Sequence, residues 1–208
     1  EAIRIALTGD IANYYDIYYR VHSQDYGWLD WAENGGVAGT TDASKRMEAI
    51  EIKLVTKNGK APGSTTQAYI QPLLQYKAHV ADIGWQSNVY GGGIAGTTGR
   101  AKQMEAIRIK LINKMYKGSI NYQTHVQDYG WLDWASEDKP GGTTGKGKRL
   151  EAIKIELTGV LAQKYDVYYR THVADYGWLD WAKNGEMAGT SGCSKQVGAI
   201  QIILVGKG

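Results

Sequence analysis

The octapeptide DYGWLDWA occurs three times without change, at residues 25–32, 128–135 and 175–182, and a degraded fourth copy, DIGWQSNV, lies at 82–89. Each copy belongs to a longer pattern, Tyr-x-x-His-x-x-Asp-x-Gly-Trp, which ends at Trp28, Trp85, Trp131 and Trp178. Successive copies of this tryptophan lie 57, 46 and 47 residues apart. Such a period is typical of folds in which each repeat is one supersecondary unit that buries its apolar face against its neighbours. The repeat therefore constrains the fold more than any other feature.

Two further segments recur with each motif. A Gly/Thr-rich loop lies at 38–41, 95–99, 141–145 and 188–192, and a run of the type EAIEIKL follows it at 48–54, 105–111, 151–157 and 198–204. A fifth run, EAIRIAL, opens the chain at Glu1. Isoleucine alternates with charged residues in these runs, which predicts half-buried strands. The run YDVYYRTHV (165–173) alternates too and is rich in β-branched and aromatic residues. We expect each EAI run to form a hairpin with the run of the YDVYYRTHV type that follows it, through the TG turn between them.

These elements predict the fold class. GWLDWA is expected to be a third, shorter strand that ends at the Asn-Gly turns beginning at Asn34 and Asn184. No segment predicts a helix. Three or four short strands per repeat, taken three times, indicate an all-β, three-fold pseudo-symmetric repeat domain, with the β-trefoil favoured over the β-prism.

The longest interval between motifs predicts the domain boundary. The extra residues fall within VTKNGKAPGSTTQA (55–68), where Gly, Pro, Ser and Thr indicate a linker. The first copy also matches the fourth better than it matches its neighbours. We therefore predict that 1–56 is the terminal repeat of a preceding domain, that 57–65 is a linker, and that 66–208 is a complete three-repeat domain.

Composition excludes several classes of function. The net charge is only +3, and Lys and Arg are spread along the chain, so neither nucleic-acid binding nor membrane insertion is indicated. Cys193 is the single cysteine and can form no internal disulfide. The chain has no nucleophile elbow, phosphate loop or zinc-type His/Cys spacing. We expect a protein that is not an enzyme and uses no cofactor or metal, with its four histidines in structural roles.

The tryptophans suggest two different roles. Those that follow the glycine (Trp28 and its equivalents) occur in every copy and are expected to be core wedges. Trp31, Trp134 and Trp181 come three residues later, on the opposite face if the strand is regular, and the second copy has Asn88 instead. For this second set, packing and binding are equally good interpretations.

The neighbours of the second tryptophan fit a sugar site. An indole ring can stack on the apolar face of a pyranose, and adjacent acceptors and donors can bind its hydroxyls. The alternative is that the aspartates only cap the turn. The candidate ligand-binding residues are Tyr26, Asp30, Trp31 and Asn34; Tyr129, Asp133 and Trp134; and Tyr176, Asp180, Trp181 and Asn184. In the second copy Gln86, Ser87 and Asn88 replace the set, so a weak or absent site is expected there.

The combined pattern, Tyr-x-x-His-Val-x-Asp-x-Gly-Trp followed by AGTTG and EAIxIxL, resembles the clostridial hydrophobic repeats with a characteristic tryptophan, the ChW family. The resemblance covers nearly the whole chain outside 55–68. It implies a secreted or cell-surface protein of clostridia or related bacteria that serves in adhesion or polysaccharide binding. It implies no catalytic residues.

Two functions remain as hypotheses. The first is an extracellular module that binds a polysaccharide or glycoconjugate through several weak sites on one frame. The second is a structural, self-assembling repeat protein, in which the repeat at 1–56 contacts other copies of the chain because one repeat cannot bury its apolar face alone. A tryptophan beside Asp and Asn in a loop favours the first.

Overall fold

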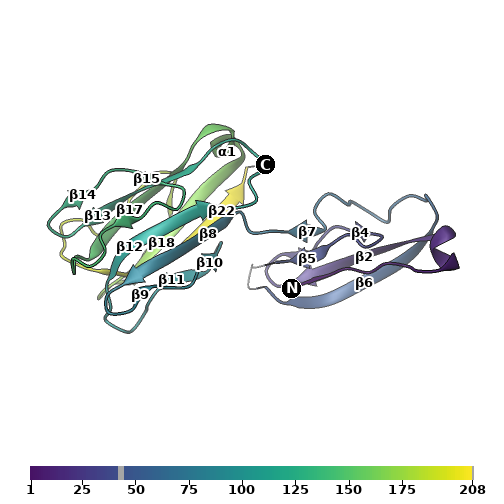
Figure 1. Cartoon of the computed structure of the whole chain (residues 1–208), viewed down its shortest axis with the longest axis horizontal. Helices are drawn as coiled ribbons and strands as arrows, with labels where there is room; N and C mark the ends of the chain where they lie inside the picture. The colour runs from purple at the N-terminus through teal and green to yellow at the C-terminus, as the bar shows by residue number, and fades with distance from the viewer. Residues whose placement is uncertain (42–44, 208) are drawn as a thin grey trace. The chain divides into compact units, whose positions relative to one another are not determined.

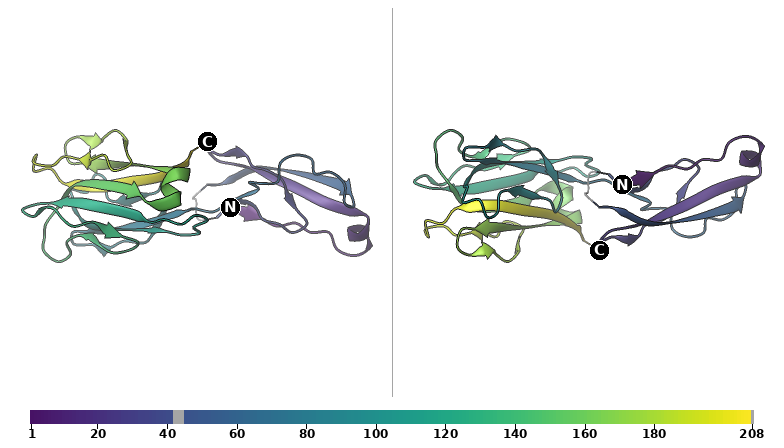
Figure 2. Two further views of the ribbon diagram at one scale, coloured as in Figure 1. Left: turned by 90° about the horizontal axis from the view of Figure 1, so that it is seen from above. Right: turned by 90° about the horizontal axis from the view of Figure 1, so that it is seen from below.

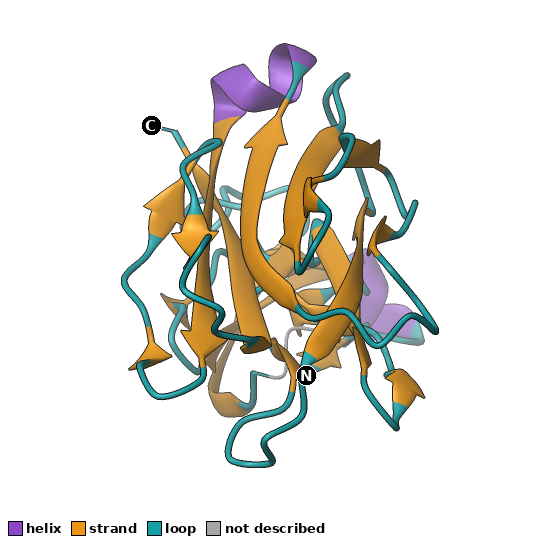
Figure 3. Ribbon diagram, turned by 90° about the vertical axis from the view of Figure 1, so that its left-hand side faces the viewer, coloured by secondary structure: helices purple, strands orange, loops and turns teal. Residues whose placement is uncertain are grey.

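The computed structural model describes residues 1–41 and 45–207, which form two compact units, Glu1–Pro72 and Leu73–Gly208 (Figure 1). Strands are the main regular structure of the chain and helices are few, as Figure 3 shows, so the all-β prediction is confirmed. The first unit contains β1 (Ala2–Ile3), η1 (Asp10–Asn13), β2 (Tyr15–Ser23), β3 (Gly27–Trp28), β4 (Ala32–Glu33), β5 (Ala38–Thr40), β6 (Met47–Thr56) and β7 (Tyr69–Ile70).

The second unit contains three times the same succession of strands. Its elements are β8 (Leu74–Val80), β9 (Gly84–Trp85), β10 (Val89–Tyr90), β11 (Ile94–Gly96), β12 (Met104–Leu111), β13 (Ile120–Val126), β14 (Gly130–Trp131), β15 (Ala135–Ser136), β16 (Gly141–Gly142), β17 (Leu150–Leu157), α1 (Gly159–Lys164), β18 (Tyr165–Val173), β19 (Gly177–Trp178), β20 (Ala182–Lys183), β21 (Ala188–Gly189) and β22 (Val197–Gly206). We number the repeats 1 (15–56), 2 (74–111), 3 (120–157) and 4 (165–206).

Each repeat is built on one antiparallel pair of long strands. The first strand carries the motif tyrosine and the second is the EAI run of the same repeat, so that Tyr169 lies opposite Ile202 in β18 and β22. The expected hairpin between an EAI run and the next repeat is therefore wrong. In the second unit the residues after β12 and β17 lead to the first strand of the next sheet, whereas the Gly/Thr loop leads the chain back to the first strand of its own repeat. The long pairs are β2–β6, β8–β12, β13–β17 and β18–β22.

Short glycine strands join the repeats of the second unit into a ring. β16 of repeat 3 pairs with β12 of repeat 2, β21 of repeat 4 pairs with β17 of repeat 3, and β11 of repeat 2 pairs with β22 of repeat 4. This gives three five-stranded sheets, each completed by a strand from another repeat. Figure 2 shows the long strands of this unit side by side.

Among its described residues, the first unit has one junction of this kind. β1 pairs with β5 of repeat 1, in the position that β12 takes on β16. β7 pairs with the other edge of β5, in parallel. The compact units accordingly divide between Pro72 and Leu73 rather than at residue 66, because Tyr69 and Ile70 belong to the first sheet. The segment predicted to be a free linker, 57–65, also lies within the first unit.

Tyrosines occupy the centre of the second unit. Tyr76, Tyr122 and Tyr169 are fully buried. The Tyr122 hydroxyl donates to the Lys139 carbonyl of its own repeat and accepts the Ile109 N–H of repeat 2 at 3.1 Å. Tyr76 likewise accepts the Ile202 N–H at 3.0 Å. Each hydroxyl therefore connects two repeats inside an apolar core, where a buried polar group needs such partners.

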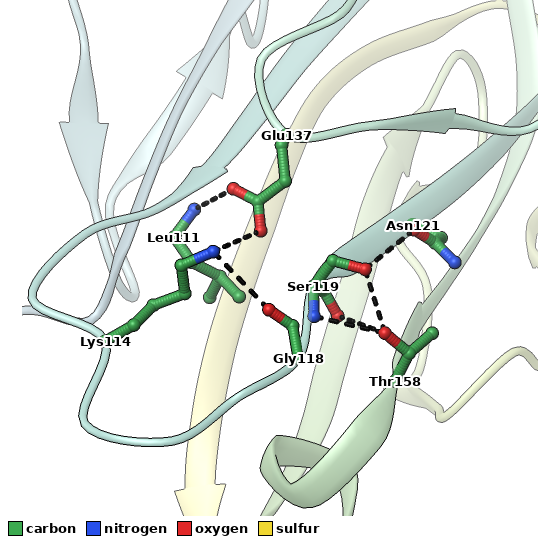
Figure 4. Close-up of polar contacts among 7 residues, drawn as sticks. All are labelled: Leu111, Lys114, Gly118, Ser119, Asn121, Glu137 and Thr158. Carbon is green, nitrogen blue, oxygen red and sulfur yellow. Dashed lines mark hydrogen bonds and ion pairs between the residues drawn. The ribbon is translucent and has the colours of Figure 1, made fainter.

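Polar contacts fix the crossing connections between repeats (Figure 4). Glu137 accepts the Leu111 N–H at 3.3 Å and lies 3.1 Å from Lys114 Nζ. Nearby, the Ser119 and Thr158 hydroxyl oxygens lie 2.8 Å apart. Thr158 precedes α1, a helix that we did not predict because its six residues are too few to show a helical period.

Candidate functional site

Three repeats carry an aspartate and a tryptophan at the point where the chain leaves the strand pairing. We call these pairs the Trp–Asp corners; they are Asp30 with Trp31, Asp133 with Trp134, and Asp180 with Trp181. In repeat 4, β19 ends at Trp178 and the Leu179 N–H donates to the Thr171 carbonyl at 3.0 Å. Pairing resumes only at Ala182. The corner residues between Trp178 and Ala182 therefore take no part in strand pairing, so they can contact other segments or a ligand.

In repeats 1 and 4 the two tryptophans lie beside one arginine. The Arg20 guanidinium carbon lies 4.9 Å from the Trp28 ring centre and 4.8 Å from that of Trp31. The same contacts, at the same distances, join Arg170 to Trp178 and Trp181. The prediction that the two rings occupy opposite faces is therefore wrong. Side chains alternate only along a continuous strand, and β3 ends at Trp28.

The first tryptophan is not a core wedge either. Trp28 is 45% exposed, and its equivalents are only partly buried. Each meets the motif histidine edge-on, with ring centres 5.3 to 5.5 Å apart. The motif tyrosine and the leucine after the tryptophan fill the interior instead, as Tyr19 and Leu29 do in repeat 1.

The corner of repeat 1 is closed by the chain itself. Trp31 is only 3% exposed, and its backbone N–H donates to the Ser64 carbonyl at 2.9 Å. Asp30 accepts the Ser64 hydroxyl at 2.7 Å, the Thr66 hydroxyl at 3.0 Å and the Gln67 N–H at 2.9 Å. These bonds, with Ser64 first, hold the pKa of Asp30 below its usual value. Residues 64–67 thus act as a built-in occupant of this corner.

A glycine lets this segment approach the indole. A Cβ on Gly63 would lie 3.0 Å from Trp31 Nε1, closer than ordinary van der Waals contact. Ser64 and Thr66 belong to the segment that composition marked only as a linker. The hydroxyl residues in this segment were the only sequence signal for such a contact. The sequence does not show that they bind Asp30, because Asp30 lies more than thirty residues away in the chain.

The corners of repeats 3 and 4 are open. Trp134 is 45% exposed and Trp181 is 40% exposed, and Asp133 and Asp180 are exposed as well. Both corners belong to the second unit. The protein therefore offers two open copies of a site whose third copy is filled by a Ser/Thr segment.

The candidate tyrosines and asparagines are placed apart from the corners. Tyr176 lies in the turn after Val173, whereas the corner residue Trp181 precedes Ala182, which pairs with Tyr169. Along β18, Val173 and Tyr169 are four residues apart, so the turn that holds Tyr176 lies about 13 Å from the level of the corner. Tyr26 and Tyr129 occupy the same turn in repeats 1 and 3.

The asparagines hold a turn. Asn34 Oδ1 accepts the Ile17 N–H at 3.0 Å, and its amide donates to Asp16 at 2.7 Å. Asn184 makes the same two bonds, to Val167 and Asp166. Both asparagines have positive φ, at 42° and 44°. We therefore assign Asn34 and Asn184 to the turn rather than to the corner.

Repeat 2 has replaced its corner with an internal contact. Gln86 stands in the position of the inward leucine, and its Oε1 accepts the Gly96 N–H at 2.7 Å. Ser87 and Asn88 follow it and are exposed. Asn88 stands where the other repeats have the second tryptophan, so the weak or absent site expected in repeat 2 stays a prediction.

Two recurring ion contacts lie beside the motifs without forming part of the corners. In repeats 1 to 3 the motif histidine faces the glutamate that opens the EAI run, as His125 Nδ1 faces Glu151 Oε2 at 3.1 Å, whereas repeat 4 has Gly198 at that position. A lysine twenty residues after the motif aspartate binds it at 2.6 Å in every repeat; the pairs are Lys45–Asp25, Lys102–Asp82, Lys148–Asp128 and Lys195–Asp175. These aspartates have positive φ, so the lysines fix a tight turn.

Removing the two hydroxyls that fill the first corner is expected to raise the pKa of Asp30. The double variant Ser64→Ala with Thr66→Ala loses the bonds that stabilise the carboxylate. Because the folded-state pKa lies below the ordinary value, the stability from these bonds is present above that value and is lost as the pH falls through the folded pKa. Carboxyl-carbon NMR titration measures the change. Thr65→Ala, which keeps both hydroxyls, is the matched control, and an unchanged Asp30 titration in the double variant would contradict this account.

Neither a metal centre nor a membrane-spanning helix is found in the part of the chain that the structure describes. Among residues 1–41 and 45–207, no three His, Cys, Asp or Glu side chains are grouped so that they could hold a metal ion. None of the helices there is long and apolar enough to cross a membrane.

Comparison with known proteins gives one result. The family model described as Clostridial hydrophobic W matches the chain four times, at residues 22–56, 79–113, 125–159 and 172–206. Each match begins at the motif histidine and ends at the last residue of the EAI strand or two residues beyond it. No curated protein and no solved structure matches the chain.

Proposed function

The chain belongs to the Clostridial hydrophobic W (ChW) family, and from that premise we propose that it is a secreted or cell-surface binding module that recognises glycans through its open Trp–Asp corners. In this proposal the module has no catalytic role. Its partner is a polysaccharide or glycoconjugate, contacted by Trp134 with Asp133 and by Trp181 with Asp180.

One observation carries the proposal, and it is the occupied corner of repeat 1. The Asp30 carboxylate accepts the hydroxyls of Ser64 and Thr66, whose oxygens lie 3.0 Å apart, and Gly63, next to Ser64, lies close against the Trp31 indole. A sugar presents the same combination, because adjacent hydroxyls flank an apolar ring face that can stack on an aromatic side chain. The corners of repeats 3 and 4 have the same Asp and Trp with no such occupant among the described residues.

Two sites on one unit make weak binding effective. Each corner presents a single ring and a single carboxylate, so its own affinity is expected to be low. Engaging a polymeric ligand at one corner raises the effective concentration at the other, and the combined avidity can exceed either affinity by about 10² to 10⁴. A polysaccharide with repeating sugars suits this arrangement better than a monosaccharide does.

A glycan-array comparison of the full chain with two variants tests the proposal. The full chain is expected to bind a subset of polysaccharides, and Trp134→Ala with Trp181→Ala is expected to abolish that binding. Neither ring belongs to the buried core, since both are 40% or more exposed, so this double variant is expected to fold, which circular dichroism checks. Trp31→Ala is the matched control because its ring is buried: it destabilises the first unit but leaves glycan binding unchanged.

Three results would contradict the glycan assignment. The first is a full chain that binds no glycan. The second is binding that survives in the folded double variant. The third is a full chain that binds a peptide with the sequence of residues 61–68 but no glycan, since the corner would then be specific for Ser/Thr peptides.

Assembly through the repeats is the second candidate function, and a single observation favours it. β6 of repeat 1 exposes Ile50, Ile52 and Leu54.

For the architecture of the second unit, we propose the β-prism in place of the β-trefoil that we expected. Support comes from the grouping of its strands into three separate sheets around one core.

A further inference from the structure

Repeat 1 exposes an apolar stripe that the other repeats bury. Ile50, Ile52 and Leu54 lie on one face of β6 and are 40%, 49% and 52% exposed. We call these three residues the open stripe. Exposing three neighbouring large apolar side chains on one strand face to water is energetically unfavourable, and such patches mark contact sites.

The second unit shows what covers this stripe. The equivalent residues of repeat 2, Ile107, Ile109 and Leu111, are 0%, 0% and 4% exposed. They belong to one core cluster with residues of repeats 3 and 4. Residue types are the same at all three positions, so the difference in burial comes from the neighbours and not from the sequence of the strand.

The edge of β6 is unpaired in the same way. Among the described residues β6 pairs only with β2. In repeat 2 the equivalent strand, β12, also receives β16, and two bonds flank that pairing: the Glu105 carbonyl accepts the Thr143 N–H at 2.9 Å and the Ile109 carbonyl accepts the Asp138 N–H at 2.7 Å. The equivalents Glu48 and Ile52 receive no such bond from the described residues. The edge therefore lacks a Gly strand of another repeat.

The other side of repeat 1 is already covered. The Ile5 carbonyl accepts the Gly35 N–H at 2.8 Å, and the Glu1 carbonyl accepts the Thr40 N–H at 2.7 Å. These are the bonds that Ile109 and Glu105 make in the second unit. Residues 1–7 thus occupy the place of an EAI strand from a neighbouring repeat. Three copies of the first unit cannot close a ring unless this strand is displaced.

We propose that the open stripe is the docking face for two further repeats of the same family, the second of which ends in the strand formed by residues 1–7. Repeat 1 is then one third of a closed unit like the second. The first of the two repeats supplies a Gly strand to the edge of β6 and a motif tyrosine to the Ile52 N–H, as Tyr122 does for Ile109.

An extended chain provides the test. Residues 73–150 are copied and joined ahead of Glu1 of the full protein, because 151–157 and 1–7 are equivalent EAI runs. Amide hydrogen exchange at Ile50, Ile52 and Leu54 is then compared between the original and the extended chain. We expect exchange at Ile52 to slow at least about tenfold, and the first unit to melt at a higher temperature.

Matched variants separate docking from a general effect of added chain. Ile52→Lys is expected to remove the protection in the extended chain but to change the original chain little, whereas Ile202→Lys unfolds the second unit in both. Sedimentation of the original chain is expected to give a monomer. The proposal is overturned if the extension leaves Ile52 unprotected, or if the extended first unit fails to fold although repeats 2 to 4 do. It is also overturned if the original chain self-associates and Ile52→Lys dissociates it, since a second copy is then the occupant.

Discussion

Replacing Gly96 with alanine is expected to lower the free energy of unfolding of the second unit by about 3 to 5 kcal/mol. Gly96 has φ +102°, where a side chain costs about 1 to 3 kcal/mol. A Cβ there would overlap the Gly198 carbonyl oxygen and lie 2.7 Å from Ala199 Cα, and such overpacking costs about 1 to 3 kcal/mol or more. Because β11 joins repeat 2 to repeat 4, the substitution opens the ring rather than loosening one loop.

Gly99→Ala is the control for this prediction. Gly99 also has positive φ, but a Cβ there meets no atom within 4 Å. It is expected to cost only about 1 kcal/mol, which is the backbone contribution alone. Urea unfolding of the full chain, followed by NMR signals of the second unit, measures both variants. Equal losses of stability in the two would show that the close approach of β11 to β22 contributes nothing.

The strands themselves were predictable from the sequence because their pattern is local. The alternation in 48–54, 105–111, 151–157 and 198–204 predicted four strands, and all four are found. The partner of each strand was not predictable. The EAI run pairs with the long strand before it, and no local rule distinguishes that from pairing with the one after it.

The positions of the corners could be predicted from the sequence, but whether each corner is open or closed could not. The pairing of Asp180 with Trp181 in a loop was visible in the motif. Whether a corner is open or closed depends on a segment far along the chain, as with Ser64 at Asp30. The failed alternation of Trp28 and Trp31 has a related cause, because the strand ends where the alternation rule was extended. Local patterns thus placed the residues, and long-range contacts determined their surroundings.

Alkaline pH is expected to destabilise the second unit through its central tyrosines. Burial raises the pKa of Tyr122 and of Tyr169 from 10.0 to about 12, and it raises that of Tyr76 as well. A raised pKa means that the stability from the neutral hydroxyl is fully present below pH 10 and is lost as the pH rises through 12. Two pKa units correspond to about 2.7 kcal/mol, so the ionisation of Tyr122 and Tyr169 alone removes a large part of a typical domain stability, and that of Tyr76 adds to it.

Tyr122→Phe separates this effect from the titration of exposed groups. At pH 8 the variant is expected to be about 1 to 3 kcal/mol less stable than the original, because the Ile109 N–H and the Lys139 carbonyl lose their partner. At pH 12 the deficit is expected to vanish or reverse, since phenylalanine cannot ionise. Tyr129→Phe, at an exposed position, is expected to follow the original at every pH. Urea unfolding at pH 8, 10, 11 and 12 gives the three curves, and the lysines titrate alike in all of them. Parallel curves for the original and Tyr122→Phe would mean that the buried hydroxyl is not what limits stability in alkali.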